Sequence, residues 1–242
     1  MYPNGNHDPR KPLRILHASD LHFLGDQSGL RTVGRQLSTL TDAVQHVGAE
    51  ALLLAGDIFD TPHVPPEEIS CLLSALGDLP VPTVLLPGNH DAHVFGNWNG
   101  TPWPNNVHLL EDRDGCHVNL PDLGLVIWGK PTYDHTPKFR PLEGLPPRPA
   151  DAWYVVMGHG LVLDHPEFLG RSSLIMEEEL AEADCDYIAL GHVHAFRDVT
   201  RGAAPAFYSG APWGSTTTPT AALVSFHPEM PTSVEPVVLP VE

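Results

Sequence analysis

The sequence predicts an α/β protein whose amino-terminal half forms a parallel sheet. Apolar runs of strand length alternate with amphipathic helical patterns along residues 13–91, in the order β-α-β-α-β. That alternation favours parallel strands joined by right-handed crossovers. Of the 242 residues, 42% are hydrophobic and 18% charged, which is typical of a globular domain and not of a disordered chain. We expect one domain over residues 13–242, preceded by a tail over residues 1–12.

Each element of the amino-terminal half follows from its own pattern. Residues 13–17, 51–55 and 83–86 are short apolar runs, as expected of buried parallel strands. After the first strand, apolar residues recur every three or four positions over residues 30–47, which predicts a helix that ends at a glycine. Proline and acidic residues at 65–68 open a second helix, because both favour the first helical turn.

The second half contains shorter elements. Residues 107–110, 116–120 and 123–128 are separated by turn residues and predict a meander. Six prolines indicate a long ordered loop over residues 130–150, and a helix is expected over about residues 173–184. The remaining strands are predicted at residues 153–157, 187–190, 206–209, 222–226 and 234–239.

Charge and cysteine content argue against several classes of protein. Thirteen Lys and Arg against thirty Asp and Glu give a net charge of −17, which works against binding a polyanion, although bound metal ions can reverse the local field. The three cysteines are widely spaced without a CxxC pair, which argues against a disulfide framework or a thiolate zinc site. No apolar run is long enough for a membrane span or a signal peptide, so we expect a cytoplasmic protein with no membrane partner.

Metal-type ligands follow five of the strand-like runs. In sheets of this kind, functional side chains gather beyond the carboxyl ends of the strands. A glycine directly precedes the ligand in four of the five segments, consistent with a tight turn or a close backbone approach. The five segments are Ser19-Asp20-Leu21-His22, Gly56-Asp57, Gly88-Asn89-His90-Asp91, Gly158-His159-Gly160 and Gly191-His192-Val193-His194.

Taken singly, each segment has an ordinary explanation. An isolated Asp-x-His or Gly-Asp is more often a solvated turn or a helix cap, and Gly-Asn-His-Asp is rich in turn formers. Chance does not explain five such segments in phase with five strand ends, all with oxygen or nitrogen ligands and none with cysteine. The sequence therefore predicts a metal site with mixed ligands suited to Mn²⁺, Fe or Zn²⁺.

This series of motifs resembles the calcineurin-like metallophosphoesterase superfamily over residues 14–194. The phrases ILHASDLHFLG, LLAGDIFD, LLPGNHD and DYIALGHVH are most similar to its SbcD-like DNA repair exonuclease branch. The resemblance implies a four-layer α-β-β-α sandwich of two mixed sheets that holds two divalent metal ions. The implied ligands are Asp20, His22 and His194 for one ion, Asn89, His159 and His192 for the other, and Asp57 as a bridge between them.

The resemblance also implies a reaction. Two ions about 3.5–4 Å apart would clamp a phosphate, most suitably Mn²⁺, with Fe or Zn²⁺ as alternatives. A hydroxide that bridges the two ions would then attack the phosphorus in line. In the family, the residue equivalent to His90 contacts the phosphate and protonates the leaving oxygen, and the acid equivalent to Asp60 orients that histidine. The alternative for Asp60 is a turn or helix cap before Thr61.

Four side chains outside the motifs are candidates for substrate binding. Trp98 and Trp103 belong to the aromatic segment after His90 and could stack on a base, the alternative being that they cover the core. Arg171 and Arg197 are close in sequence to the last ligands and could bind a phosphate, or lie on a solvated face.

The expected function is hydrolysis of a phosphodiester, in a nucleotide or at a nucleic-acid end, with exonuclease activity as one form. A phosphomonoesterase is the alternative, although Ser/Thr phosphatases have Gly-Asp-x-x-Asp-Arg-Gly where this chain has GDIFDTP, without the arginine. An inactive scaffold is a weaker alternative because no ligand position is lost. SbcD-like nucleases continue into a DNA-binding cap, which we expect to be missing here after residues 207–212. Nucleic-acid binding and homodimer formation are left open.

Overall fold

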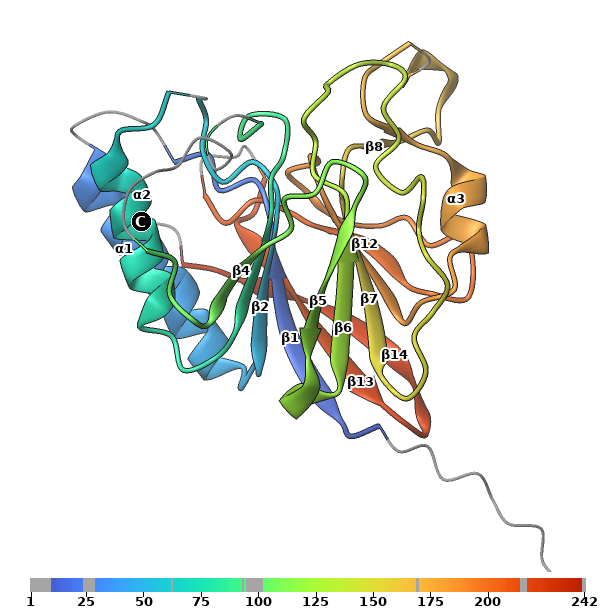
Figure 1. Cartoon of the computed structure of the whole chain (residues 1–242), viewed down its shortest axis with the longest axis horizontal. Coiled ribbons are helices and arrows are strands. Elements are labelled where there is room, and N and C mark those ends of the chain that lie inside the picture. Colours follow the sequence, from blue (N-terminus) through green and yellow to red (C-terminus); the bar gives the residue numbers. More distant parts are fainter. Residues whose placement is uncertain are drawn as a thin grey trace, which may run out of the picture.

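Two six-stranded sheets lie face to face in the computed structural model (Figure 1), which describes residues 10–23, 29–61, 63–92, 94, 102–168, 170–213 and 217–240. The first sheet contains, in spatial order, β14 (Met230–Val238), β13 (Thr220–His227), β1 (Leu13–Ala18), β2 (Ala51–Ala55), β3 (Thr83–Leu86) and β4 (Val107–Leu109). The second contains β11 (Phe196–Asp198), β12 (Ala206–Ser209), β10 (Tyr187–Gly191), β7 (Trp153–His159), β6 (Leu125–Gly129) and β5 (Cys116–Leu120).

Both sheets are mixed, with a parallel centre. In the first sheet β1, β2, β3 and β4 are parallel, and β13 and β14 continue it in antiparallel pairing. In the second sheet β6, β7, β10 and β12 are parallel, flanked by antiparallel β5 and β11. The loops that follow the parallel strands rise at the upper edge in Figure 1, so the two sheets offer their carboxyl ends to one shared rim.

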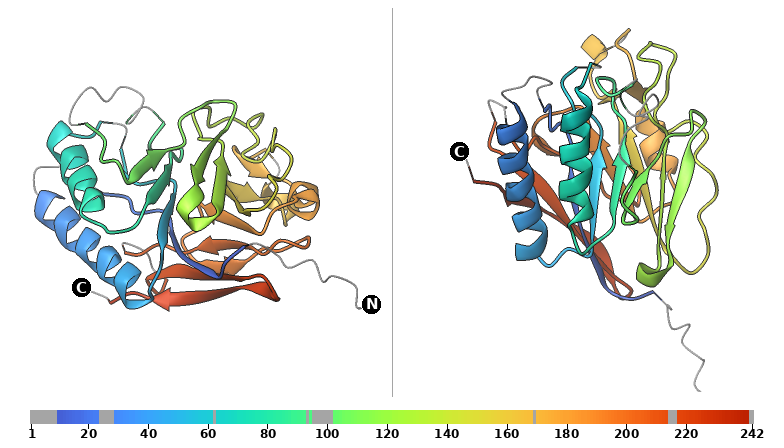
Figure 2. Two further views of the ribbon diagram at one scale, coloured as in Figure 1. Left: turned by 60° about the horizontal axis from the view of Figure 1, so that its bottom comes forward. Right: turned by 60° about the vertical axis from the view of Figure 1, so that its left-hand side comes forward.

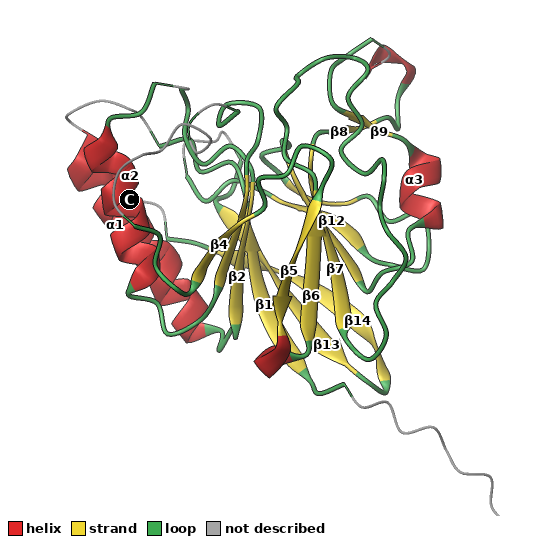
Figure 3. Cartoon of the chain, viewed as in Figure 1, coloured by secondary structure: helices red, strands yellow, loops and turns green. Residues whose placement is uncertain are grey.

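The helices lie on the outer faces of the sheets, as the colouring by secondary structure shows (Figure 3). Helices α1 (Gly29–His46) and α2 (Pro66–Gly77) lie side by side on the first sheet (Figure 2), and α3 (Glu177–Glu182) lies on the outer side of the second. Two short 3-10 helices, Pro121–Leu123 and Pro166–Phe168, and the two-stranded sheet of β8 (Leu161–Val162) and β9 (Leu174–Ile175) complete the elements of the described chain. None of the helices described is long and apolar enough to cross a membrane.

Apolar side chains fill three layers of core. In β1, Ile15 points into the core between the sheets, whereas Leu16 points into the core under α1 and α2, because successive strand residues face opposite sides. A third cluster, which includes Trp128 and Leu180, covers the outer face of the second sheet. The α-β-β-α sandwich implied by the sequence resemblance is thereby confirmed.

Two predicted elements differ from the structure. β4 does not join a meander with β5 and β6 but pairs in parallel with β3 in the other sheet. The segment before it returns the chain to the amino end of β3, where the Asn106 side chain donates hydrogen bonds to the carbonyls of Leu76, Leu79 and Val81 at 2.9–3.3 Å. The helix expected over 173–184 is shorter, because its first residues form β9 and pair with β8. In both places, pairing with a strand that is distant in sequence determines the structure, and the local sequence pattern does not.

Candidate metal centre

The loops that follow β1 and β2 remain paired beyond the ends of their strands. The Asp20 amide donates to the Gly56 carbonyl at 2.9 Å, and the His22 amide donates to the Asp57 carbonyl at 3.0 Å. This continued pairing fixes the Asp-x-His segment against the Gly-Asp segment at the rim where the parallel strands end.

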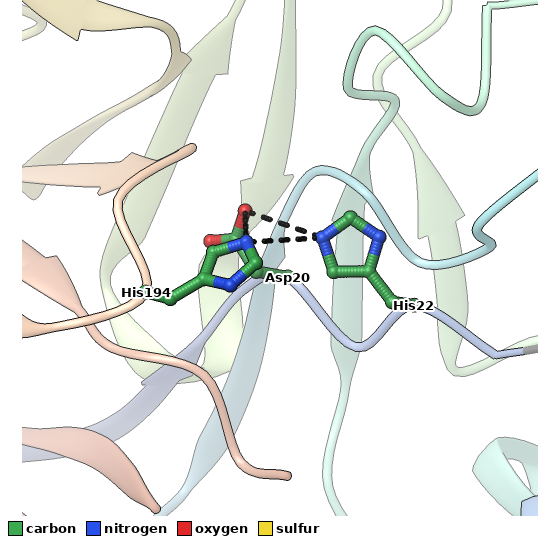
Figure 4. Close-up of side chains that lie close together, drawn as sticks. All are labelled: Asp20, His22 and His194. Carbon is green, nitrogen blue, oxygen red and sulfur yellow. Dashed lines mark hydrogen bonds and ion pairs between the residues drawn. The ribbon is translucent and has the colours of Figure 1, made fainter. Parts of the chain in front are cut away.

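One group of candidate ligands contains Asp20, His22 and His194 (Figure 4). The two imidazole Nε2 atoms are 3.1 Å apart, and Oδ1 of Asp20 is 3.6 Å from Nε2 of His194 and 4.0 Å from Nε2 of His22. Asp20 and His22 come from the first sheet, whereas His194 follows β10 of the second. Three donor atoms that converge in this way can bind one cation.

A second group contains Asp57, His159 and His192. Nε2 of His159 is 3.2 Å from Oδ2 of Asp57, and Nδ1 of the same ring is 2.9 Å from the Ala55 carbonyl. Because a carbonyl oxygen only accepts, Nδ1 of His159 carries the proton and donates it, which turns Nε2 to the site. Metal-binding histidines are commonly held in this way by a hydrogen bond from the ring nitrogen that does not bind the metal.

Backbone amides hold both carboxylates in place. The His192 amide donates to both oxygens of Asp20 at 3.0 and 3.1 Å, and the Ser19 hydroxyl donates to Oδ2 of Asp20 at 2.5 Å. The His90 amide donates to Oδ1 of Asp57 at 2.9 Å. Each carboxylate is therefore oriented by a loop from another strand.

The loops adopt a demanding backbone conformation at the candidate ligands. Six non-glycine residues of the described chain have positive φ, and four of them are Asp20, His22, Asp57 and His192. Such conformations cost free energy and persist where the surrounding structure enforces them, often at functional sites. Gly88 allows a close approach, because a Cβ there would lie 2.2 Å from Oδ1 of Asp57.

Burial and charge determine the protonation of the two carboxylates. Burial raises the pKa of Asp20, against the opposing effects of nearby His159 and of its hydrogen bonds. Burial would also raise the pKa of Asp57, but the charge of His159 and the hydrogen bond with it dominate and lower that pKa.

The histidines of the second group are affected in opposite directions. Burial acts to lower the pKa of His159, but the charge of Asp57 and its hydrogen bond raise it to about 9. Burial and the nearby charge of His159 lower the pKa of His192 to about 3. His192 therefore offers a neutral ring nitrogen, as metal binding requires.

The donor set fits divalent cations. It combines carboxylate oxygens, an amide oxygen and imidazole nitrogens, which suit Mn²⁺, Fe or Zn²⁺. The side-chain oxygen of Asn89 is buried and has no hydrogen-bond partner among the described residues. A buried acceptor without a partner is costly, and ligation of a cation would satisfy it.

His90 and Asp60 lie beside the first group of ligands. Nδ1 of His90 donates to the Asp60 carbonyl at 2.9 Å, and its Nε2 is 3.9 Å from Oδ2 of Asp57. The carboxylate of Asp60 is nearer to another ring, 3.2 Å from Nδ1 of His22 against 3.9 Å from Nδ1 of His90. The backbone of Asp60 thus orients His90, and its side chain contacts a candidate ligand.

The sequence reasoning gave Asp91 no role, although it ends the Gly-Asn-His-Asp motif. Its buried carboxylate accepts hydrogen bonds from the amides of Gly88, Ile58 and Phe59 at 2.9–3.0 Å. It therefore joins the loops after β2 and β3. A carboxylate directly after Asn89 and His90 was the available signal, but its partners Ile58 and Phe59 are distant in sequence.

The structure describes three of the four candidate substrate-binding residues. Trp103 belongs to the segment that leads to β4 and is partly buried against the core under α1 and α2. Trp98 lies outside the described residues. Arg197 is exposed and ion-paired with Asp164. Arg171 is exposed in the segment between β8 and β9.

The fold and this set of residues define a class of metal-dependent phosphoesterases. The chain matches the calcineurin-like phosphoesterase family over residues 13–196 and belongs to it. It is 28% identical over 244 residues to the SbcD component of the nuclease SbcCD of Bacillus subtilis (strain 168), a match that covers 83% of this chain and 61% of that protein.

Two solved structures resemble the chain at low sequence identity. GAP50, described as the anchor in the inner membrane complex of Plasmodium, shares 10% identity with a TM-score of 0.53, covering 95% of this chain and 85% of that one. A predicted phosphoesterase from Streptococcus pneumoniae TIGR4 shares 16% identity with a TM-score of 0.47, covering 94% and 90%. The similarity to GAP50 is one of fold.

Proposed function

We propose that the chain is a dinuclear-metal phosphodiesterase that acts on nucleotides or on nucleic-acid ends. The observation that carries this proposal is the meeting of two ligand groups, Asp20–His22–His194 and Asp57–His159–His192, at the shared rim of two sheets. Nuclease activity is the form supported by the name of the Bacillus relative. The chain spans 61% of that relative, so its substrate is proposed from the site and not transferred.

The first group, Asp20, His22 and His194, would hold one cation. Asn89, His159 and His192 would hold the other, and the Asp57 carboxylate would serve both. Two divalent ions at such a site activate water for attack on phosphorus and neutralise the charge that develops on the phosphate. Manganese is our first choice among the metals because the ligands mix oxygen with imidazole nitrogen.

His90 would deliver a proton to the leaving oxygen. Its Nδ1 hydrogen bond to the Asp60 carbonyl fixes the ring, and 38% of its side chain is exposed, so a substrate can reach it. General acid catalysis of this type contributes about 10²–10⁴-fold to a rate.

A diester substrate is favoured over a monoester by two observations. Residues 56–62 read GDIFDTP, without the arginine typical of Ser/Thr protein phosphatases, and the Bacillus relative is named a nuclease. The three cysteines are free, which supports a reducing compartment such as the cytoplasm.

An activity screen with a matched variant tests the proposal. Metal-depleted protein receives Mn²⁺, Fe²⁺ or Zn²⁺ and is assayed on an aryl phosphodiester, an aryl phosphomonoester, cyclic nucleotides, and single-stranded and duplex DNA. We expect diester cleavage that a chelator abolishes and added metal restores, and no activity in Asp57→Ala. A strong preference for the monoester, or full activity after exhaustive chelation, would refute the proposal.

A further inference from the structure

A histidine outside the ligand motifs lies beside the second ligand group. His135 belongs to the loop over residues 130–150, and its ring centroid is 6.3 Å from that of His192. The loop is attached to two ligand-bearing segments, because Thr132 donates from its amide to the Pro87 carbonyl at 3.1 Å and from its hydroxyl to the His159 carbonyl at 3.3 Å. His135 is thus fixed relative to the centre although its side chain is exposed.

A buried serine holds the His135 ring. Nδ1 of His135 is 3.1 Å from the hydroxyl of Ser173, which is fully buried and has positive φ. Ser173 is itself held against the His159 segment, since its carbonyl accepts from the Leu161 amide at 3.0 Å. Within the described chain, Nδ1 of His135 is the hydrogen-bond partner of this hydroxyl.

The tautomer of the ring depends on the direction of the serine hydrogen bond. If the Ser173 hydroxyl donates its proton to Nδ1, the proton of a neutral imidazole lies on Nε2. His135 then carries one N–H group that no described residue uses, beside a candidate metal site.

Two imidazoles outside the two ligand groups lie near rings of different groups. The His90 ring lies 5.1 Å from the ring of His22, in the first ligand group, whereas His135 lies 6.3 Å from His192, in the second. His135 belongs neither to these two ligand groups nor to the further group of His22, Asp60 and His90 that could hold a metal in the described chain. A phosphate bound across both groups would therefore lie near His90 at the first group and near His135 at the second.

We propose that His135 is a substrate-binding residue that donates its Nε2 proton in a hydrogen bond to a non-bridging oxygen of the phosphodiester. This inference rests on the proposed function, since it concerns the substrate of that site. Ser173 is the residue that positions His135. The interaction binds phosphate in the ground state as well as during reaction, so it acts on KM more than on kcat.

The test uses His135→Ala, His135→Gln and Ser173→Ala, with His46→Ala as the control. His46 is exposed at the end of α1, at the edge of the molecule opposite the rim. Calorimetry measures binding of inorganic phosphate to the manganese-loaded protein, and kinetics measure KM and kcat on an aryl phosphodiester. Losing a hydrogen bond to a charged group should weaken phosphate binding and raise KM by about tenfold or more in His135→Ala.

The other variants refine the expectation. Glutamine keeps a donor N–H and should recover part of the phosphate affinity, whereas Ser173→Ala should show a smaller loss in the same direction. In His135→Ala the manganese stoichiometry should be unchanged, and kcat should change by less than about threefold, as expected for removal of uniform binding.

Each contrary outcome has a distinct meaning. Unchanged phosphate affinity in His135→Ala, or wild-type protein that binds no phosphate, would overturn the inference. Loss of one manganese ion in His135→Ala would make the residue a metal ligand and also overturn it. If wild-type protein binds phosphate through His135 but hydrolyses no diester, the proposed function fails while phosphate binding by His135 stands.

Discussion

Neighbouring histidines take different roles because of the atoms that they contact. His22 has one ring nitrogen near the Asp60 carboxylate and the other near His194, so both of its nitrogens belong to the centre. His90 donates Nδ1 to a backbone carbonyl, and its Nε2 approaches no closer than 3.9 Å to Asp57. The first pattern suits a ligand, and the second suits a group that exchanges a proton with a substrate.

Removal of the His90 imidazole should separate metal binding from catalysis. In His90→Ala we expect kcat on an aryl phosphodiester to fall by about 10²–10⁴-fold, because a general acid of this kind is lost. Manganese binding, measured by calorimetry, should remain, since the proposed ligand Asn89 is untouched and the His90 amide can still donate to Asp57. Turnover near that of the wild type would discard the role assigned to His90.

His17 should make the folded state sensitive to acid. It is buried in β1 with Nδ1 2.8 Å from the Tyr187 hydroxyl, and burial lowers its pKa from 6.5 to about 3. The unfolded chain therefore binds a proton below pH 6.5 that the folded chain does not bind until about pH 3. Above pH 6.5 the neutral His17 makes its full contribution to the free energy of unfolding. Between pH 6.5 and about pH 3 that contribution falls by about 1.4 kcal/mol per pH unit.

Urea unfolding of metal-free protein between pH 7 and pH 4 measures this dependence. His17→Gln lacks the titrating group, so its unfolding free energy should fall less steeply with decreasing pH than that of the wild type. His46→Ala, which removes an exposed histidine, serves as the control and should keep the wild-type slope. Equal slopes in His17→Gln and wild type would show that His17 does not have this linkage.

The candidate ligands are positioned mainly by loops, and Asp91 connects two of these loops. Its carboxylate accepts three backbone amides from the segments after β2 and β3. In Asp91→Asn the amide nitrogen cannot accept a hydrogen bond, so buried N–H groups lose their partner at about 1–3 kcal/mol each. We expect the free energy of unfolding to drop by about 2–4 kcal/mol, with weaker manganese binding.

Chemical denaturation and manganese calorimetry provide the measurements. Asp112→Asn is a matched control, because Asp112 also accepts a backbone amide, that of Asp114 at 3.0 Å, but in an exposed turn. Its stability should change by less than about 1 kcal/mol. Comparable losses in the two variants would mean that Asp91 does not hold the loops as argued.

The elements that the sequence predicts well are those whose evidence is local. Apolar runs identify β1, β2, β3, β7 and β10, and the ligand motifs come directly after them, so their meeting at one rim follows from parallel topology. The placement of β4 beside β3, and of residues 174–175 in a strand, depends on partners distant in the chain. The contacts of His135 and Asp91 were not predicted for the same reason: their partners Ser173 and Ile58 lie in other loops.

The centre connects the two halves of the molecule. Asp20 and Asp57 follow strands of the first sheet, whereas His159 and His192 belong to or follow strands of the second. A cation bound by both would add contacts across the sheet interface that do not depend on apolar packing. It would also neutralise the negative charge of Asp20, whose charged form burial disfavours, in a chain whose net charge is −17.

Metal binding should therefore stabilise the whole fold and not only the loops. A ligand that binds only the folded state at 100 times its Kd contributes about 2.7 kcal/mol, which corresponds to a rise of about 5–10 °C in Tm for a chain of this size. Differential scanning fluorimetry of metal-depleted protein with and without Mn²⁺ measures the shift. Asp57→Asn should abolish most of it, because the carboxylate between the two ligand groups is neutralised, whereas Asp42→Asn, an exposed change on α1, should retain it. A full shift in Asp57→Asn, or none in the wild type, would contradict a metal centre that spans the two sheets.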